Sequence, residues 1–472
     1  MDNKKTQVLS KGMHLYVNIR NLNIVIRKEE KQTNNLSRVF HAMDNYVSTV
    51  EDFINTYNDE VYVEKLTNSR LHIVFYDKIS IAENFLEVIK FLHHLTGKIN
   101  LDNKYQKLVD FKVSMGADYG YFTEFDFTPS TDQNSLEFTS IGFPANRAAK
   151  LEGNADEGEL LLSLEGYNVI RRLLTAKLSL TSYSKTQKIN IKYSNSEIYT
   201  FSNFENIADT NRYRSKLNTA QVRYTNNITQ KRFGDIIFTD ANKQVNFDNL
   251  SLLSPKKIDA VVIYADIRGF TKKFKIDGSN LIAMSNATKL VLQEMYNSVI
   301  NKGGTHVQFQ GDRESAFRND YNQDDYVLKG LQTAMYILEK IKLQSQTTGN
   351  DFHIGIGCSY GTVYAAKVGI RGHKHNLILG ETVRKANFAE DEHAGDDQIA
   401  ITQDMYSYLL QINNSRYKNA ISSIFKYDND SHYITSTKFS EFTQILMKLA
   451  ENHNSQDAKP YNPQSPWHDQ SI

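Results

Sequence analysis

The sequence predicts an α+β fold with two tandem ferredoxin-like domains, and three observations lead to this prediction. The chain has 472 residues, which is more than one ordinary hydrophobic core accommodates. The order strand, helix, hairpin, helix, strand occurs twice along it, and such a unit can form a sheet with helices on one face. Short runs of residues also recur between the two copies at an offset of about 238 to 248 residues.

The first copy begins with a predicted strand over 13–20, followed by a helix whose apolar residues recur at helical spacing from Leu36 to Tyr57. Two apolar runs, Val61–Leu66 and Leu71–Tyr76, flank Thr-Asn-Ser-Arg and predict a hairpin. The other elements expected in this copy are a helix over Ile81–Leu95 and strands over Phe111–Ala117, Glu159–Ser163 and Ile191–Tyr193.

The second copy begins at about residue 258 and repeats this order. Its first strand is predicted by the apolar run Val261–Ala265. The elements that follow are a helix carrying Met284 to Val299, a hairpin over His306–Phe317, a helix over Tyr326–Ile341 and a strand over Phe352–Cys358. The run Met-Gly-Ala-Asp-Tyr-Gly (115–120) parallels Ile-Gly-Cys-Ser-Tyr-Gly (356–361). We therefore interpret the chain as one unit that has been duplicated.

These patterns place the domain boundaries. We expect a first domain over 1–205, a polar linker over 206–257, a second domain over 258–445 and a disordered tail over 446–472. Within the linker, Gly234–Phe238 is a candidate short strand. Its basic residues are typical of a solvated connector, and a phosphate-binding arm is the alternative.

Composition restricts the class of protein. The net charge of +1 gives no case for binding nucleic acid or an anionic membrane. The single cysteine, Cys358, excludes an intrachain disulfide and suits a reducing compartment. No apolar run approaches the roughly 20 residues that span a bilayer, and the N-terminus lacks the apolar core of a signal peptide. We expect a soluble, cytoplasmic protein.

Two carboxylates stand at ends of predicted strands in the second copy. Asp266 ends the strand Val261–Ala265 and precedes a turn in which Gly269 lets the backbone approach a ligand closely. Asp312 follows Gly311 in the turn of the predicted hairpin. Two carboxylates on neighbouring strands suit a pair of hard divalent cations that also bind phosphate oxygens. The alternative for each is a capping or turn aspartate.

The runs Asp-Ile-Arg-Gly-Phe-Thr (266–271) and Gly-Asp (311–312) resemble the two metal motifs of class III nucleotidyl cyclases. The resemblance extends from about residue 258 to 440. It implies two divalent cations, Mn²⁺ or Mg²⁺, at Asp266, Ile267 and Asp312. It also implies that the turn after the first motif binds the triphosphate, through Ile267, Gly269, Phe270 and Thr271.

The second copy departs from this family at four other positions. Where the family has base-contact residues, this copy has Gln308 and Leu377. Arg384 stands in place of the catalytic Asn, and Phe388 in place of the Arg that stabilises the transition state. A leucine has no polar atom for a base edge, and a phenylalanine cannot stabilise charge on phosphate.

The first copy shows the inverse pattern. Asn18 and Ser69 stand at its metal positions, so both carboxylates are missing. The family positions for base contact hold Lys65 and Thr139, the catalytic Asn position holds Asn146, and Lys150 replaces the transition-state Arg. Residues 146 and 150 are four apart on a predicted helix, so their side chains share a face. Taken alone, the two lysines are typical of a solvated surface and Asn146 of a helix cap.

Class III sites form between two such domains, so the resemblance implies an intramolecular pseudo-heterodimer with one site per chain. The pseudo-symmetric second site would lack metal carboxylates. We expect a monomer with a pseudo-dimeric site, or a weak homodimer. The implied reaction is attack of a ribose 3′-hydroxyl on the α-phosphorus of a nucleoside triphosphate, which releases pyrophosphate.

The base is less determined. Lys65 donates hydrogen bonds, while Thr139 donates and accepts, so ATP and CTP are equally compatible with this pair. The tandem units and divergent motifs resemble the bacterial pyrimidine cyclases of Pycsar antiphage defence. This favours a pyrimidine, CTP before UTP, and a separate effector that the cyclic nucleotide activates. The alternatives are an adenylyl cyclase that makes cyclic AMP, and an inactive cyclase-like module that only binds a nucleotide.

Overall fold

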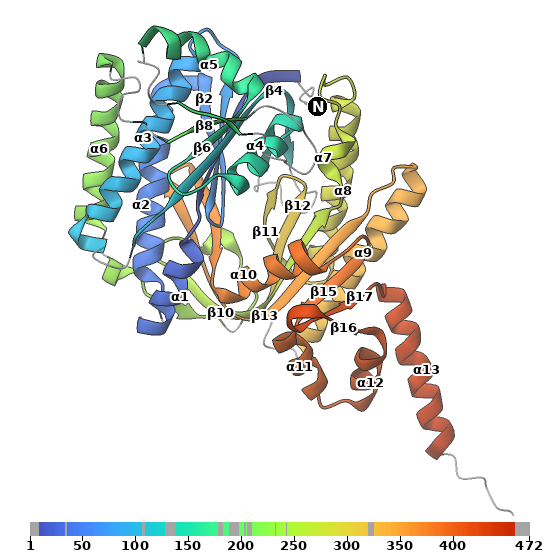
Figure 1. The fold of residues 1–472 in the computed structure, drawn as a ribbon. Coiled ribbons are helices and arrows are strands. Elements are labelled where there is room, and N and C mark those ends of the chain that lie inside the picture. The colour runs from blue at the N-terminus through green and yellow to red at the C-terminus, as the bar shows by residue number, and fades with distance from the viewer. Residues whose placement is uncertain are drawn as a thin grey trace, which may run out of the picture.

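The computed structural model describes residues 9–33, 35–105, 109–127, 137–177, 183–187, 198–202, 204, 210–231, 233–241, 243–319 and 325–457. In these residues the chain forms two mixed β-sheets covered by α-helices (Figure 1). The strand orders are β2-β3-β1-β4-β6-β8-β7 and β11-β12-β10-β13-β15-β17-β16. The two orders are the same when each strand of the second copy is matched to its equivalent in the first. The duplication predicted from the sequence is therefore present in the fold.

The first half consists of one sheet and its helices. Its strands are β1 (Leu9–Ile19), β2 (Val61–Thr67), β3 (Arg70–Tyr76), β4 (Val113–Phe127), β5 (Glu137–Ile141), β6 (Leu160–Ser163), β7 (Tyr183–Gln187) and β8 (Ile198–Phe201). Its helices are α1 (Leu22–Thr33), α2 (Ser37–Ile54), α3 (Ile81–Leu101), α4 (Phe143–Asn154) and α5 (Leu164–Lys177). The strand predicted at Ile191–Tyr193 lies outside the described residues.

The second half repeats the arrangement with additions at its C-terminal end. Its main strands are β10 (Lys256–Ile267), β11 (Thr305–Gln310), β12 (Arg313–Arg318), β13 (Ile354–Ile370), β14 (His373–Leu379), β15 (Gln398–Thr402), β16 (Lys426–Asp428) and β17 (His432–Thr435). Its helices are α7 (Phe270–Lys273), α8 (Leu281–Asn301), α9 (Tyr326–Thr348), α10 (Glu381–Phe388), α11 (Gln403–Gln411), α12 (Ser415–Ile424) and α13 (Phe439–Asp457), with a π-helical turn over Ala389–His393.

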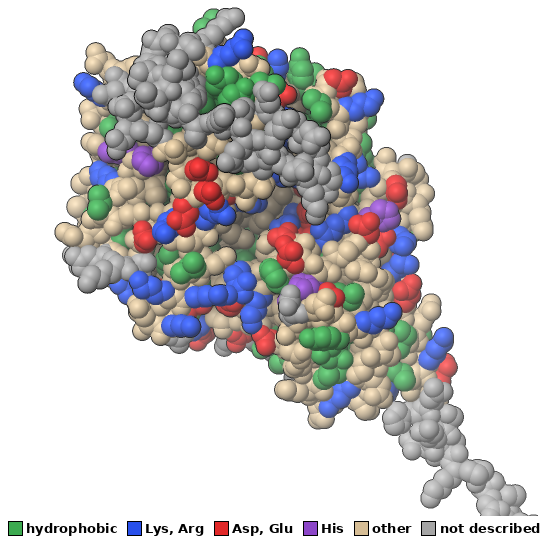
Figure 2. All heavy atoms as spheres, in the orientation of Figure 1, with side chains coloured by type: hydrophobic (Ala, Val, Ile, Leu, Met, Phe, Trp, Pro, Cys, Tyr) green, Lys and Arg blue, Asp and Glu red, His purple; other side chains and the backbone are tan. Residues whose placement is uncertain are grey.

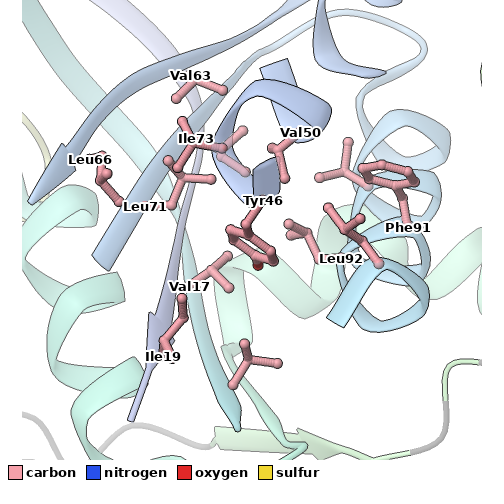
Figure 3. Packing of buried hydrophobic residues seen from close by; sticks show 14 of the residues in the cluster. Val17, Ile19, Tyr46, Val50, Val63, Leu66, Leu71, Ile73, Phe91 and Leu92 are labelled. Atoms are coloured by element: carbon pink, nitrogen blue, oxygen red, sulfur yellow. The ribbon is translucent and has the colours of Figure 1, made fainter. Parts of the chain in front are cut away.

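Each central sheet is covered on both faces, whereas the sequence predicted helices on one face. In the first half, α2 and α3 pack on one side, where Val17, Tyr46 and Leu92 meet (Figure 3). In the second half, alternate residues of β10 face opposite ways, with Ile263 in the core under α8 and α9 and Val262 in the core beside α10. A strand buried on both faces explains the continuous apolar run Val261–Ala265.

Two glycines of the repeated runs permit this second layer. A Cβ atom on Gly116 would lie 2.4 Å from the carbonyl oxygen of Ala148 on α4. A Cβ atom on Gly357 would lie 2.3 Å from the carbonyl oxygen of Ala386 on α10. Both distances are too short for any side chain, so α4 and α10 pack directly on strand backbone, and this fixes the position of the side chains they carry.

The halves exchange long arms across a pseudo-twofold interface. Strands β13 and β14 leave the second sheet and pack on α2 and β2, while β4 and β5 pack on α8 and β11. Tyr364 and Leu377 of the first arm belong to the core of the first half, and Phe127 and Ile141 of the other arm belong to the core of the second. The sequence predicted β4 and β13 only as short strands, so it did not predict these arms.

The segment predicted as a polar linker is structured. Residues Asn211–Gln230 form helix α6, which packs along α2, and Thr239–Asp240 form strand β9 beside β10. A 3₁₀ turn over Phe233–Asp235 replaces the strand expected at 234–238. Three of its basic residues pair with carboxylates, Arg212 with Glu87, Arg223 with Asp52 and Lys231 with Asp44. These pairs leave little support for a phosphate-binding arm.

The predicted tail also differs at its start. Helix α13 continues to Asp457, so residues 446–457 are helical where disorder was expected, and 458–472 lie outside the described residues. At the start of this helix, the Lys438 amide donates to the Glu441 carboxylate. Within the described ranges, no helix is both long and apolar enough to cross a membrane.

Candidate active site

A cavity of about 770 Å³ opens between the two halves. Basic and acidic side chains both surround the hollow on this face of the molecule (Figure 2). Nine of the ten predicted site residues line it, namely Lys65, Asn146, Lys150, Asp266, Ile267, Gly269, Phe270, Thr271 and Asp312. Thr139 does not line it. Residues from both copies therefore meet in one cavity.

The two aspartates occupy neighbouring strand ends. Asp266 lies near the end of β10, paired in register with Arg313 on β12, and Asp312 lies in the β11–β12 turn directly before that arginine. Burial raises the pKa of Asp266, although Arg313 and Arg268 oppose the rise. Burial and then the charge of Asp266 raise the pKa of Asp312 well above its usual value. Mutual repulsion of this kind is relieved by a bound cation, so the pair fits a divalent metal.

The turn after Asp266 has the geometry predicted for it. Gly269 adopts a φ of 66°, in the left-handed region, and begins the short helix α7. The amides of the first turn have no partner within a helix, so those of Gly269, Phe270 and Thr271 are available to an anion. The Ile267 side chain is buried in the core, so this residue can reach a ligand only through its backbone.

Lys150 crosses from the first half to this turn. Its ammonium donates to the Thr271 hydroxyl at 2.9 Å. Burial lowers the pKa of Lys150, and the charges of Asp312 and Asp266 oppose the decrease. Asn146, one turn earlier on α4, has a buried Nδ2 atom that has no hydrogen-bond partner among the described residues. An unpaired buried amide at a cavity wall indicates a polar ligand.

A β-bulge aims the predicted base-contact lysine into the cavity. The β2–β3 register shifts between Val63 and Lys65, and the β11–β12 register shifts at the equivalent place, between His306 and Gln308. Bulges commonly re-aim a side chain next to an active site. Lys65 donates to the Thr139 hydroxyl at 2.5 Å and to the Phe309 carbonyl at 3.1 Å. Thr139 is fully buried, so it lies behind Lys65 rather than at the cavity surface.

A buried ionic cluster that the sequence did not predict lies against the Lys65 ammonium. This ammonium lies 3.4 Å from the Glu137 carboxylate, which also accepts a hydrogen bond from His306 at 2.9 Å. His306 in turn lies 2.8 Å from Glu314. Burial lowers the pKa of His306, but Glu314 and Glu137 raise it by more than burial lowers it, so that it reaches about 10. The imidazolium therefore joins two carboxylates, one from each half.

Glu64, at the bulge, is a second acidic neighbour of Lys65. Its carboxylate lies 3.6 Å from the Lys65 ammonium and 3.1 Å from the His72 imidazole, and it accepts from the Ser140 hydroxyl. Burial would raise the pKa of Glu64, but His72 and Lys65 lower it to about 2. Glu64 lines the cavity and adds an acceptor beside the predicted donor.

The pseudo-symmetric positions are occupied differently. Asn18 pairs in register with Arg70, as Asp266 pairs with Arg313, so Asn18 and Ser69 do stand at the equivalent of the metal positions. Arg384 donates to Glu381 at 3.0 Å, and Glu381 also binds Arg27 of the first half. The three remaining residues are Gln308 and Leu377, which are buried, and Phe388, which is 39% exposed. At the two positions equivalent to Asp266 and Asp312, this side of the interface therefore has an amide and a hydroxyl in place of carboxylates.

Two arginines at the site were missed, although the sequence contains a signal for both. Each copy has an arginine two residues after its first metal position. Arg20 donates to the carbonyl of Ala155, directly after α4, and Arg268 donates to the carbonyl of Ala394, directly after the π-helical turn. Arg70 and Arg313 likewise follow the second metal position. Comparison of the copies with each other would have shown both repeated arginines.

One further cluster outside the cavity has the spacing of a metal site. Single ligand atoms of Glu51, His373 and His375 lie within 4.8 Å of one another. The hydrogen bonds of His375 argue against a metal, because its Nδ1 accepts from the Leu66 amide while its Nε2 lies 2.9 Å from Glu51. Coordination through Nε2 would then require an imidazolate. The cluster therefore acts as an interface contact between α2 and β14.

Two sheets with the same strand order thus face each other across the cavity that contains the paired aspartates. Residues 253–426 match the family model described as the adenylate and guanylate cyclase catalytic domain. The matched residues lie within the second half. No protein of curated function matches the chain.

One solved structure matches the fold of both halves. A class III adenylyl cyclase-like ATP-binding protein from Pseudomonas aeruginosa is 17% identical, with a TM-score of 0.65 over 93% of this chain and 91% of that chain. The adenylyl cyclase CyaB from P. aeruginosa is 18% identical, with a TM-score of 0.31 over 39% of this chain and 94% of that chain. The guanylyl cyclase domain of the RhoGC fusion protein from Blastocladiella emersonii is 22% identical, with a TM-score of 0.31 over 38% of this chain and 97% of that chain. The predicted tandem cyclase fold is confirmed.

Proposed function

We propose that this protein is a nucleotidyl cyclase that converts a nucleoside triphosphate into a 3′,5′-cyclic nucleotide and pyrophosphate. The observation that carries the proposal is the contact of Lys150, from the first half, with Thr271 in the turn beside Asp266 of the second. One cavity thereby combines a cation, a carboxylate pair and a turn with outward amides. Neither half holds this set by itself.

The carboxylates of Asp266 and Asp312 and the backbone of Ile267 would hold two divalent cations, Mn²⁺ or Mg²⁺. Such ions, when bound, lower the pKa of the ribose 3′-hydroxyl and neutralise phosphate oxygens. The amides of Gly269, Phe270 and Thr271 bind the triphosphate.

The first half acts on the reacting atoms. Asn146 donates its free amide to the ribose, and Lys150 offsets the negative charge that develops on the α-phosphate oxygens. As the bond between O3′ and the α-phosphorus forms, the bond from that phosphorus to the bridging oxygen breaks. Pyrophosphate leaves with the electron pair, and the O3′ proton is released to water. A lysine offers a point charge where an arginine offers two parallel donors, so turnover is slower than an arginine would allow.

We propose a pyrimidine base, with CTP preferred to UTP. To bind the base, the Lys65 ammonium would exchange its 3.4 Å contact with Glu137 for a ring nitrogen or carbonyl, and Glu64, 3.6 Å from that ammonium, would accept from an exocyclic amine. This donor–acceptor pair fits cytosine N3 with N4 and also adenine N1 with N6. The preference for a pyrimidine rests on the resemblance to Pycsar cyclases, and with it the proposal that the product activates a separate effector during antiphage defence.

A second candidate is a nucleotide-binding module without turnover. The solved structure that matches both halves is described as an adenylyl cyclase-like ATP-binding protein. The absence of an arginine at position 150 also favours this reading.

An assay with four substrates tests the proposal. The purified protein is incubated with Mn²⁺ and ATP, CTP, GTP or UTP separately, and the products are identified by chromatography and mass spectrometry. Cyclic CMP as the main product supports the proposal. Cyclic AMP alone would exclude the pyrimidine preference, and binding of a nucleotide without any cyclic product would favour the second candidate.

A further inference from the structure

Each half pairs an arginine with a buried glutamate next to its first metal position. In the first half, Arg70 lies 2.7 Å from Glu152, and in the second, Arg313 lies 2.5 Å from Glu390. Both glutamates are fully buried. The pair also occurs in the half that has no metal carboxylates, so its primary role is structural. It joins the hairpin to the helix that packs on the sheet.

In the second half, this arginine lies close to a carboxylate that a metal needs. The Arg313 Nε atom is 3.6 Å from Asp266 Oδ1, whereas the equivalent position opposite Arg70 holds the neutral Asn18. A guanidinium forms strong paired hydrogen bonds with a carboxylate. If Arg313 closed on Asp266, it would occupy the oxygens that bind a divalent cation and would place a positive charge beside that cation.

The second half has two groups that restrain Arg313, and the first half lacks both. Asn387 accepts from Arg313 Nη1 at 2.7 Å, and Asp391 lies 2.5 Å from Nη2. Asn387 also donates to Asp391 at 2.5 Å. The equivalent residues of the first half, at the offset that aligns Asn146 with Arg384, are Ala149 and Gly153. The two restraining groups thus occur only in the half whose arginine faces a metal carboxylate.

We propose that Asn387 and Asp391 are positioning residues that hold the Arg313 guanidinium against Glu390 and away from Asp266. Asp266 and Asp312 then remain free to bind a divalent cation, and the carboxylate of Asp391 balances the charge of Arg313 beside it. The inference rests on the proposed function, because it assumes that this carboxylate pair binds metal.

The test measures Mn²⁺ binding to the full chain without nucleotide, by the loss of the free-ion electron paramagnetic resonance signal. Asp391→Asn should weaken binding on the order of tenfold, as loss of a group that orients a metal ligand does, and Asn387→Ala should weaken it less. Asp266→Asn serves as the reference for a lost ligand. Thermal unfolding of each variant monitors the fold.

A double variant separates positioning from direct coordination. If Asp391 acts through Arg313, then Arg313→Gln with Asp391→Asn should bind Mn²⁺ no more weakly than Arg313→Gln alone. A loss as complete as that of Asp266→Asn, unrelieved in the double variant, would make Asp391 a metal ligand and overturn the inference. Unchanged binding by Asp391→Asn would also overturn it while leaving the proposed function intact. Absence of Mn²⁺ binding by the wild type would overturn both.

Discussion

The Lys150 ammonium donates to the Thr271 hydroxyl at 2.9 Å, and the two residues belong to different copies of the duplicated unit. Through this contact, the half without the paired aspartates places a cation at a turn of the half that has them. The proposed site therefore draws on both copies rather than on either copy alone.

The first prediction concerns the charge at position 150. Lys150→Ala should lower kcat by about 10²- to 10³-fold, the usual cost of removing one group that stabilises transition-state charge. Lys150→Arg should retain or increase kcat, because a guanidinium offers paired donors to phosphate oxygens. Steady-state kinetics with the preferred nucleotide measure both. Equal loss in the two variants would show that the lysine acts by its shape and not by its charge.

The second prediction concerns base recognition. Lys65→Gln should lower kcat/KM for the preferred nucleotide by roughly 10- to 100-fold, since a buried donor to the base is weakened. Thr139→Val, which removes only the hydroxyl that holds Lys65, should have a smaller effect in the same direction. The comparison of kcat/KM over all four nucleotides is the measurement. A uniform loss across the four would mean that Lys65 does not read the base.

The third prediction is a pH dependence of stability. Because the pKa of His306 is raised from 6.5 to about 10 in the fold, its stabilising contribution is complete below about pH 6.5 and is lost as the pH rises through 10. Between these limits the loss is at most about 1.4 kcal/mol per pH unit. Urea unfolding from pH 6 to 10 measures it. His306→Gln should flatten the profile, and an equally steep profile in that variant would contradict the assignment to His306.

The fourth prediction concerns the cluster of Glu51, His373 and His375. Glu51→Gln should lower the free energy of unfolding by about 1–3 kcal/mol, because it removes the carboxylate that accepts from both imidazoles and from the Ile370 amide. A strong chelator should leave the melting temperature of the wild type unchanged. A chelator-induced decrease that Glu51→Gln abolishes would identify a bound metal instead.

Local patterns in the sequence were sufficient for most of the fold. The apolar periodicity of Leu36 to Tyr57 and the hairpin around residues 67–70 correspond to α2 and to β2–β3. The arms were missed because their lengths depend on contacts with the other half: the continuation of β13 past Cys358 is buried against α2. Helix α6 was missed for a related reason, since its polar residues are held by partners such as Asp52 and Glu87.

The residues of the candidate site were predicted in outline because family positions mark Asp266 and Asp312 in the second copy and Asn146 and Lys150 in the first. Its supporting charges could not be predicted in this way. Glu137 and His306 lie 169 positions apart and meet only because the β4–β5 arm crosses to β11. The burial of Thr139 behind Lys65 likewise depends on the bulge in β2, which alternation of residues along a strand does not reveal.

The central claim is that one chain contains one complete site, with metals held by its second half and the remaining groups supplied by its first. Mixing Asp266→Ala chains with Lys150→Ala chains tests it most directly, with cyclic nucleotide formation as the readout and wild-type protein as the reference. Each variant should be inactive alone, and the mixture should be inactive too, because both defects lie in the same intramolecular site. Recovery of activity in the mixture, after co-expression or refolding together, would contradict it and place the site between two chains.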